Sequence, residues 1–206
     1  MRAVLVTAGL SLALAATTLE ACGGALAVEG GENWLVATGL LPKLRRLHDD
    51  FLAAMAELHP RHCNYRIGDR VPVNRRRYRI IGYLGAGEQG DVYLVATRNG
   101  RRAVKCLRYP SAVERVRETA SLAEQRGERV VETLDTDAIR GILLLEYVEG
   151  LPLKYLSRPR IREQLTRREL QLLDEGLATR VQPYDLADAN RVLYLSDGGI
   201  VVFDPM

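Results

Sequence analysis

The chain has 206 residues, of which 47% are hydrophobic and 27% charged, and its formal net charge is +3. This length fits one domain of ordinary size with an appendage, and the apolar fraction is sufficient for a hydrophobic core. The small charge excess shows no basic stripe of the kind that nucleic-acid-binding domains carry, so no nucleic-acid partner is expected. The cysteines, Cys22, Cys63 and Cys106, are too few for a disulfide framework.

Residues 1–27 carry a pattern that two structures could explain. Arg2 precedes an apolar run, residues 3–16, and Ala25-Leu26-Ala27 follows, which is the order of a secretory signal peptide. Glu20, close to the cleavage region, favours a buried N-terminal helix instead. The run is too short to span a bilayer in the mature chain. A signal peptide would make the protein secreted or periplasmic, and a buried helix would make it cytoplasmic.

Residues 28–77 are predicted to form a helical extension followed by a linker. Apolar residues recur at spacings of three and four from Leu40 to Leu58, which predicts an amphipathic helix that ends before Pro60. Residues 61–77 are polar and turn-rich, so the domain boundary is placed there. The arginine run at 75–77 is interpreted as the solvated end of an element rather than as a phosphate-binding patch.

From residue 78 the pattern changes to strands. Asn99-Gly100 is a strong hairpin turn. Ser111 and Glu114 form a predicted capping box at the start of a helix, and Gly127 is a natural end for it. Five strands are predicted around this helix: 78–84, 91–96, 102–107, 130–134 and 141–147.

The remaining elements are a helix and a hairpin. Apolar residues between Ile161 and Leu173 indicate the helix. Two short strands, 192–195 and 200–203, follow with a turn at Asp197-Gly198-Gly199.

A glycine-rich loop is the first motif with chemical meaning. Residues 85–92 read Gly-Ala-Gly-Glu-Gln-Gly-Asp-Val, which matches G-x-G-x-x-G-x-V. Glycines let a backbone turn approach phosphates and point its amides at them. A dinucleotide-binding loop would open directly into a helix. This loop leads into a strand, and Ala103-Val104-Lys105 falls on the next strand, where the pattern V-A-I-K places a phosphate-binding lysine.

Lys105 would need an acidic partner from the helix that follows. Glu118 is chosen because two turns of helix remain beyond it. Glu124 is the competing candidate, since it shares the helical face of Val113, Val116 and Ala120.

Polar residues near the end of the sequence form the last motif with chemical meaning. Asp185 and Asn190 stand in the spacing D-x-x-x-x-N, and Asp204 follows the final hairpin. In this spacing the carboxylate of Asp185 can face an acceptor hydroxyl while Asn190 and Asp204 hold a magnesium ion.

Taken together, residues 78–204 resemble the protein-kinase-like superfamily. The first half is similar to the eukaryotic-type pattern. The second half is similar to lipopolysaccharide core heptose kinases and to minimal secreted effector kinases of bacteria. Three departures stand out: Pro183-Tyr184 replace His-Arg, Ala187 replaces a lysine, and Asp204-Pro205-Met206 replaces D-F-G.

The resemblance implies an α+β fold for residues 78–206. A five-stranded antiparallel small lobe with one helix would be followed by a much reduced, mostly helical large lobe that ends at the catalytic hairpin. The amphipathic helix of residues 40–58 has no place in such a domain. It would either pack against the reduced large lobe or remain a tethered targeting or partner-binding helix.

The resemblance also implies ATP and Mg²⁺ as cofactors. Lys105, Glu118 and Asp185 would be catalytic, and Asn190 and Asp204 would bind the metal. Leu145 would be the gatekeeper of a hinge in which Glu146 and Val148 meet the adenine edge. The remaining nucleotide-binding residues would be Gly85, Ala86, Gly87, Gly90, Val92 and Ala103.

The expected activity is that of a minimal Ser/Thr-type kinase acting on a protein. A sugar or another small molecule is the alternative acceptor. A nucleotide-binding pseudokinase that acts by binding a partner is the rival function.

Overall fold

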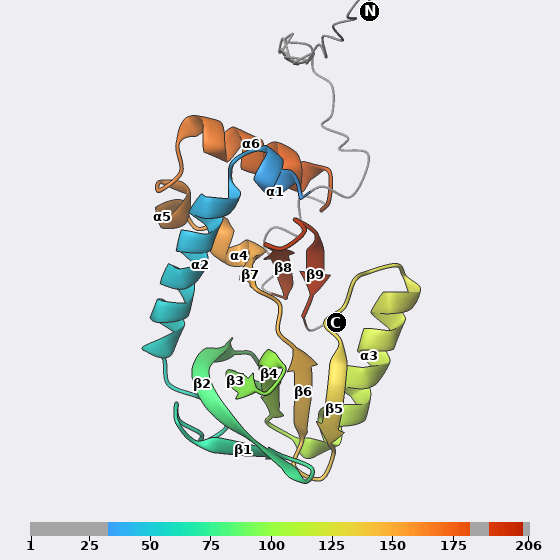
Figure 1. Ribbon diagram of the computed structural model, residues 1–206. Coiled ribbons are helices and arrows are strands. Elements are labelled where there is room, and N and C mark those ends of the chain that lie inside the picture. The colour runs from blue at the N-terminus through green and yellow to red at the C-terminus, as the bar shows by residue number, and fades with distance from the viewer. Residues whose placement is uncertain (1–32, 182–189, 204–206) are drawn as a thin grey trace, which may run out of the picture.

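The computed structural model describes residues 33–181 and 190–203. Two lobes are stacked one above the other (Figure 1), and the fold is α+β. The lower lobe is a curled antiparallel sheet with one helix on it, and the upper lobe is mostly helical. Among the described residues, no helix combines the length and the apolarity needed to cross a membrane.

The large sheet has six strands in the order β1-β2-β3-β4-β6-β5, and every neighbouring pair is antiparallel. Its strands are β1 Arg70–Val73, β2 Arg76–Ala86, β3 Gly90–Thr97, β4 Gly100–Leu107, β5 Thr133–Asp137 and β6 Ile142–Glu146. The hairpin predicted at Asn99-Gly100 is confirmed, with Gly100 at φ 98°. As predicted for β6, its residues Ile142 to Leu145 are all buried.

The predicted count of five strands is wrong because β1 lies within the presumed linker. Val71 and Val73 are fully buried, and they alternate with residues that point away from the core. Asn74, at φ 51°, turns the chain into β2. β1 is only four residues long and is followed by arginines. Its alternation of buried and exposed residues is therefore too short to identify a strand from the sequence.

One helix, α3 (Val113–Gln125), packs on the large sheet. The predicted capping box is wrong: a 3-10 turn, Pro110–Ala112, precedes the helix, and its N-cap residue makes no side-chain hydrogen bond. The predicted end of the helix is confirmed, since Gly127 follows it at φ 81°. The next residues do not begin a strand at once: Val130 instead bridges in parallel to Val202 of the upper lobe.

The upper lobe contains a three-stranded antiparallel sheet, β7 (Gly150–Pro152), β8 (Arg191–Tyr194) and β9 (Ile200–Val202). The predicted final hairpin is therefore present as β8 and β9. Three helices replace the single one predicted, namely α4 Leu153–Leu156, α5 Pro159–Arg162 and α6 Arg167–Ala178. The division arises at Thr166, which forms a capping box with Glu169 and so begins a new helix.

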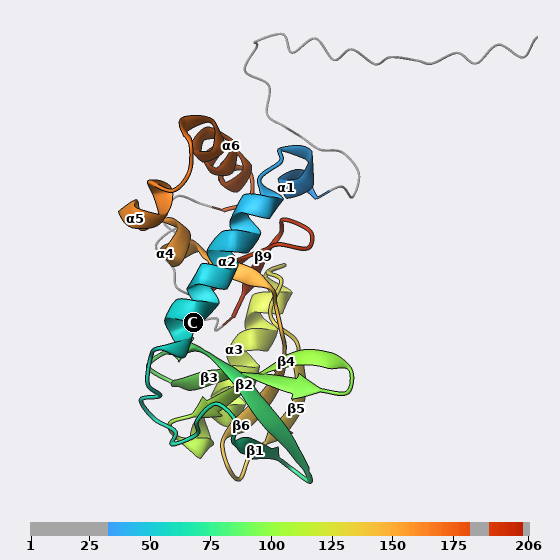
Figure 2. The same cartoon turned by 60° about the vertical axis from the view of Figure 1, so that its left-hand side comes forward.

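Two N-terminal helices, α1 (Trp34–Ala37) and α2 (Leu41–Ala56), complete the upper lobe. Leu35 and Leu44 are fully buried in a core that α4, α6 and β8 share. The indole N–H of Trp34 donates to the carbonyl of Gly198 at 2.8 Å. The prediction that this helical segment packs against the later helices, rather than remaining a tethered helix, is confirmed. Figure 2 shows α2 continuing from that lobe down to the sheet.

Candidate functional site

A cleft of about 210 Å³ lies between the two lobes. The turn between β2 and β3 and the side chain of Lys105 line it from the sheet, and Val148, Asn190 and Val192 line it from the chain that follows. The two groups come from distant parts of the sequence. The fold therefore brings the glycine loop, Lys105 and Asn190 together, as the sequence predicts.

The glycine loop forms a tight turn in which the amide of Gly87 donates to the carbonyl of Gly90 at 2.9 Å. Gly85 has φ 140°, a conformation that side chains disfavour. A Cβ on Gly90 would come within 2.0 Å of the Cys106 carbonyl oxygen, so only glycine fits there. A Cβ on Gly87 would meet nothing within 4 Å. Gly85, Ala86, Gly87, Gly90 and Val92 all line the cleft.

Lys105 lies on β4 in the middle of the sheet, opposite Val92 on one side and Leu143 on the other. Only 3% of its surface is exposed. Its ammonium group donates to the side-chain oxygen of Gln89 at 3.1 Å. The glycine loop itself therefore supplies a partner that sequence reasoning did not assign to Lys105.

The predicted pairing of Lys105 with Glu118 is wrong. Glu118 is exposed on α3, and no ion pair between these two described residues is formed. The helix buries Val113 and Ala123 against the sheet. At about 100° per residue, Glu118 lies about 140° around the helix from Val113 and points away. Glu124, the alternative, is exposed as well.

The connection between the lobes carries the predicted hinge. Val148 lines the cleft, whereas Ala103 and Leu145 are buried in the core beneath α3. Glu146 is half-buried, and its amide donates to the Glu132 carbonyl at 2.9 Å, whereas the contact predicted with adenine involves its carbonyl. Of the three predicted hinge residues, only Val148 faces the cleft.

Helix α2 forms a wall of the cleft that sequence reasoning did not foresee. His48, Phe51 and Leu52 line it, and His48 Nε2 lies 3.3 Å from the hydroxyl of Tyr147 in the hinge. Burial lowers the pKa of His48, although the carboxylates of Glu149 and Asp49 oppose the shift. Burial raises the pKa of Tyr147 to about 12. The apolar spacing of Phe51 and Leu52 was visible, but it indicated only packing.

Asp91, the acidic residue after the glycine loop, anchors the segment between α2 and the sheet. Its carboxylate is fully buried. It accepts hydrogen bonds from the amides of residues 61–63 at 2.7–3.0 Å and from the Tyr83 hydroxyl at 2.9 Å. His62 Nε2 also lies 3.2 Å from the Gly87 carbonyl. The N-terminal extension is thereby tied to the glycine loop.

Asp185, the predicted catalytic carboxylate, and Asp204, a predicted metal ligand, lie outside the described residues. Asn190 is described, and its carbonyl accepts from the Phe203 amide at 2.7 Å. Within the described ranges, no group of three or more His, Cys, Asp or Glu side chains could hold a metal ion. The predicted metal pair of Asn190 and Asp204 therefore stays a prediction.

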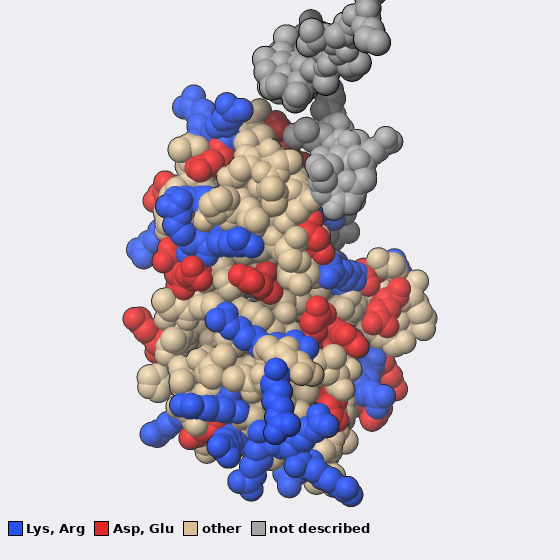
Figure 3. Space-filling view, in the orientation of Figure 1, with Lys and Arg blue, Asp and Glu red and all other residues tan. Residues whose placement is uncertain are grey.

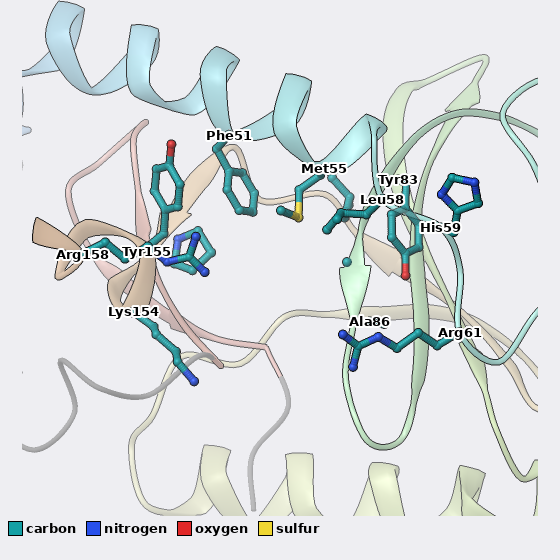
Figure 4. A pocket seen from close by; sticks show the side chains of 13 residues that line it. Phe51, Met55, Leu58, His59, Arg61, Tyr83, Ala86, Lys154, Tyr155 and Arg158 are labelled. Atoms are coloured by element: carbon teal, nitrogen blue, oxygen red, sulfur yellow. The ribbon is translucent and has the colours of Figure 1, made fainter. Parts of the chain in front are cut away.

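A second cavity of about 360 Å³ opens beside the cleft (Figure 4). The two share Phe51, Pro152 and the end of β2. Apolar side chains of α2 line one side, and Arg61, Lys154 and Arg158 reach it from opposite ends. None of these three cations forms an ion pair with a described residue. Arg158 instead lies over the ring of Tyr155.

Comparison with known proteins gives matches among solved structures only. No protein-family model and no curated protein matches this chain. The PknI kinase domain of Mycobacterium tuberculosis is 20% identical over 68% of this chain and 63% of that one, with a TM-score of 0.40. The BubR1 kinase domain is 15% identical over 81% of this chain and 58% of that one, with a TM-score of 0.41. The chain thus spans less than two thirds of the kinase domains to which it is similar.

Proposed function

We propose that this protein transfers the terminal phosphate of Mg-ATP to a hydroxyl group, as a minimal Ser/Thr-type kinase. The observation that carries the proposal is the meeting of the glycine loop, Lys105 and Asn190 in one cleft between two lobes. A glycine turn with open space at Gly87 and a buried lysine beside it suit a chain of phosphates.

The residues of the cleft fit a nucleotide. Val92, Val148 and Val192 offer apolar surface for a base, and Lys105 offers an ammonium group for phosphate oxygens. Bound Mg-ATP would supply the phosphoryl group and the charge of the metal. Asn190 and Asp204 would hold the metal, and Asp185 would orient the acceptor hydroxyl. Gln89 would keep the Lys105 ammonium group directed at the loop.

The second cavity supports a small acceptor as the alternative to a protein. Its volume of about 360 Å³ falls within the range of small-molecule sites. Apolar walls with three cations at their ends would suit a molecule with an apolar body and a phosphate or carboxylate group. Such an acceptor would enter beside the glycine loop, where the cavity meets the cleft.

A pseudokinase is the second candidate, and the position of Glu118 favours it. In kinases an acidic side chain of this helix holds the lysine for transfer, whereas Glu118 is exposed and points away from the sheet. Binding of nucleotide would then serve to order the glycine loop for a partner.

The test uses the purified full chain and three variants. Mg-ATP should raise the melting temperature of the wild type and of Lys43→Ala, a lysine outside the cleft, but not of Lys105→Ala. Asp185→Asn should keep this shift and lose transfer of radiolabelled phosphate. A wild type that shifts without transferring phosphate supports the pseudokinase. A folded wild type that Mg-ATP does not shift overturns both functions.

A further inference from the structure

Arginines stand opposite one another across the first two strands of the large sheet. The register places Arg70 of β1 directly opposite Arg79 of β2. Arg77 lies two residues before Arg79 and so shares its face of the strand. The other face of β2 carries Tyr78 and Ile80, which are buried. These arginines therefore project together on the outer side of the sheet.

The turn between the two strands extends this cationic surface. Arg75 and Arg76 are exposed there. None of Arg70, Arg75, Arg76, Arg77 and Arg79 forms an ion pair with a described residue. Figure 3 shows Lys and Arg gathered over the lower end of the molecule, where β1 and β2 lie in Figure 1. Like charges directly opposite each other in a sheet are destabilising. Contact with an anionic surface would neutralise the arginine charges and so reduce their repulsion.

An apolar side chain stands at the same end. Ile139, in the turn between β5 and β6, is 90% exposed. That turn lies beside the β1–β2 turn, because Asn74 donates to the Asp137 carboxylate at 2.9 Å and to the Thr136 carbonyl at 3.0 Å. Ile81, two residues after Arg79, is 39% exposed. Exposed cations and exposed aliphatic side chains thus occur together on the strands and turns at this end of the molecule.

We propose that this arginine face, with Arg70, Arg77 and Arg79 on the outer side of the sheet, Arg75 and Arg76 at the turn and Ile139 at its tip, docks on a membrane surface rich in anionic lipids. Guanidinium groups pair well with phosphate, and an exposed isoleucine can enter the boundary between headgroups and acyl chains. A binding site for single-stranded nucleic acid would instead offer aromatic side chains for base stacking. Tyr78, which lies between Arg77 and Arg79 in the sequence, is buried in the sheet. The proposal is independent of phosphate transfer, since no residue of the arginine face lines the cleft.

Sedimentation of the full chain with lipid vesicles tests the proposal. Vesicles of phosphatidylcholine with about 30% phosphatidylserine, in about 0.1 M salt, should bind the wild type, and phosphatidylcholine alone should not. Arg77→Gln/Arg79→Gln should weaken binding about 25-fold, at about five-fold for each charge removed. Arg45→Gln/Arg46→Gln removes an equal charge from exposed positions of α2 and should leave binding unchanged.

A second variant separates a membrane from other polyanions. Ile139→Ser, which adds no charge, should weaken vesicle binding without changing the melting temperature, because the side chain is exposed in the free protein. The proposal is overturned if both arginine pairs have equal effects or if neutral vesicles bind equally well. It is also overturned if an RNA or DNA oligonucleotide binds more tightly than the vesicles and Ile139→Ser has no effect.

Discussion

Replacing Asp91 with asparagine should destabilise this protein severely. The carboxylate is fully buried and organised by four donors. Its Oδ1 accepts from the Arg61 amide at 3.0 Å and from the Tyr83 hydroxyl at 2.9 Å. Its Oδ2 accepts from the amides of His62 and Cys63, each at 2.7 Å.

The size of the effect follows from this geometry. Asparagine keeps one side-chain oxygen and puts an NH₂ group in place of the other. Whichever oxygen is replaced, two donors lose their acceptor. A hydrogen bond to a charged group contributes about 1.5–3 kcal/mol, so the free energy of unfolding should fall by about 3–6 kcal/mol. This is a large share of the total of about 5–15 kcal/mol that is typical of a domain.

Urea unfolding followed by circular dichroism measures the change. Asp69→Asn is the matched control, because Asp69 accepts from the Arg66 amide at 2.7 Å but is exposed. Asp69→Asn should lower the free energy of unfolding by less than about 1 kcal/mol. A loss below about 1 kcal/mol for Asp91→Asn would contradict the reasoning.

The pH dependence offers a second check on Asp91. Burial raises the pKa of this carboxyl, but the hydrogen bonds from three amides and Tyr83 outweigh it and leave the pKa below its ordinary value of 3.8. The contribution of the ionised Asp91 carboxylate to the free energy of unfolding is fully present above pH 3.8. It is lost as the pH falls through the lower pKa of the folded state. Asp91→Asn should lack this loss.

Three further predictions concern α1, α2 and their packing. Leu44→Ala should cost about 2–5 kcal/mol in urea unfolding because the side chain is fully buried, whereas Leu58→Ala, 51% exposed, should cost less than about 1 kcal/mol. Burial lowers the pKa of His48 below 6.5, so below pH 6.5 the unfolded chain binds a proton more readily than the folded one. The free energy of unfolding of the wild type should therefore fall as the pH drops below 6.5, and that of His48→Gln should not. Parallel pH profiles of the two proteins would contradict this. A Cβ at Gly176 would lie 2.2 Å from the Trp34 ring, so Gly176→Ala should lower the melting temperature, and adding Trp34→Ala should cost less than the sum of the two changes.

Local signals were sufficient for much of the sheet. The turn at Asn99-Gly100 and the end of α3 at Gly127 depend on glycine backbones with positive φ, a property of single residues. The tight turn of the glycine loop likewise needs Gly90, because the Cys106 carbonyl leaves no room for a side chain. Motifs of this kind are readable because their cause lies within a few residues.

Other sequence predictions failed where the spacing of residues does not fix the start or the rotation of a helix. Ser111 and Glu114 have the spacing of a capping box, yet a 3-10 turn precedes the helix. Glu118 is placed by the rotation of α3, which depends on how Val113 and Ala123 pack against the sheet. Neither the start of the helix nor its rotation can be obtained from spacing alone.

By itself, the sequence determined the glycine loop, the strand that carries Lys105 and the amphipathic nature of α2. The tertiary structure alone decided that α2 lines the cleft through His48 and Phe51 and that Gln89 contacts Lys105. It also decided that β1 sets Arg70 opposite Arg79. The physical reason is that periodicity shows which face of an element is apolar, whereas the register and contacts between elements depend on packing over the whole chain.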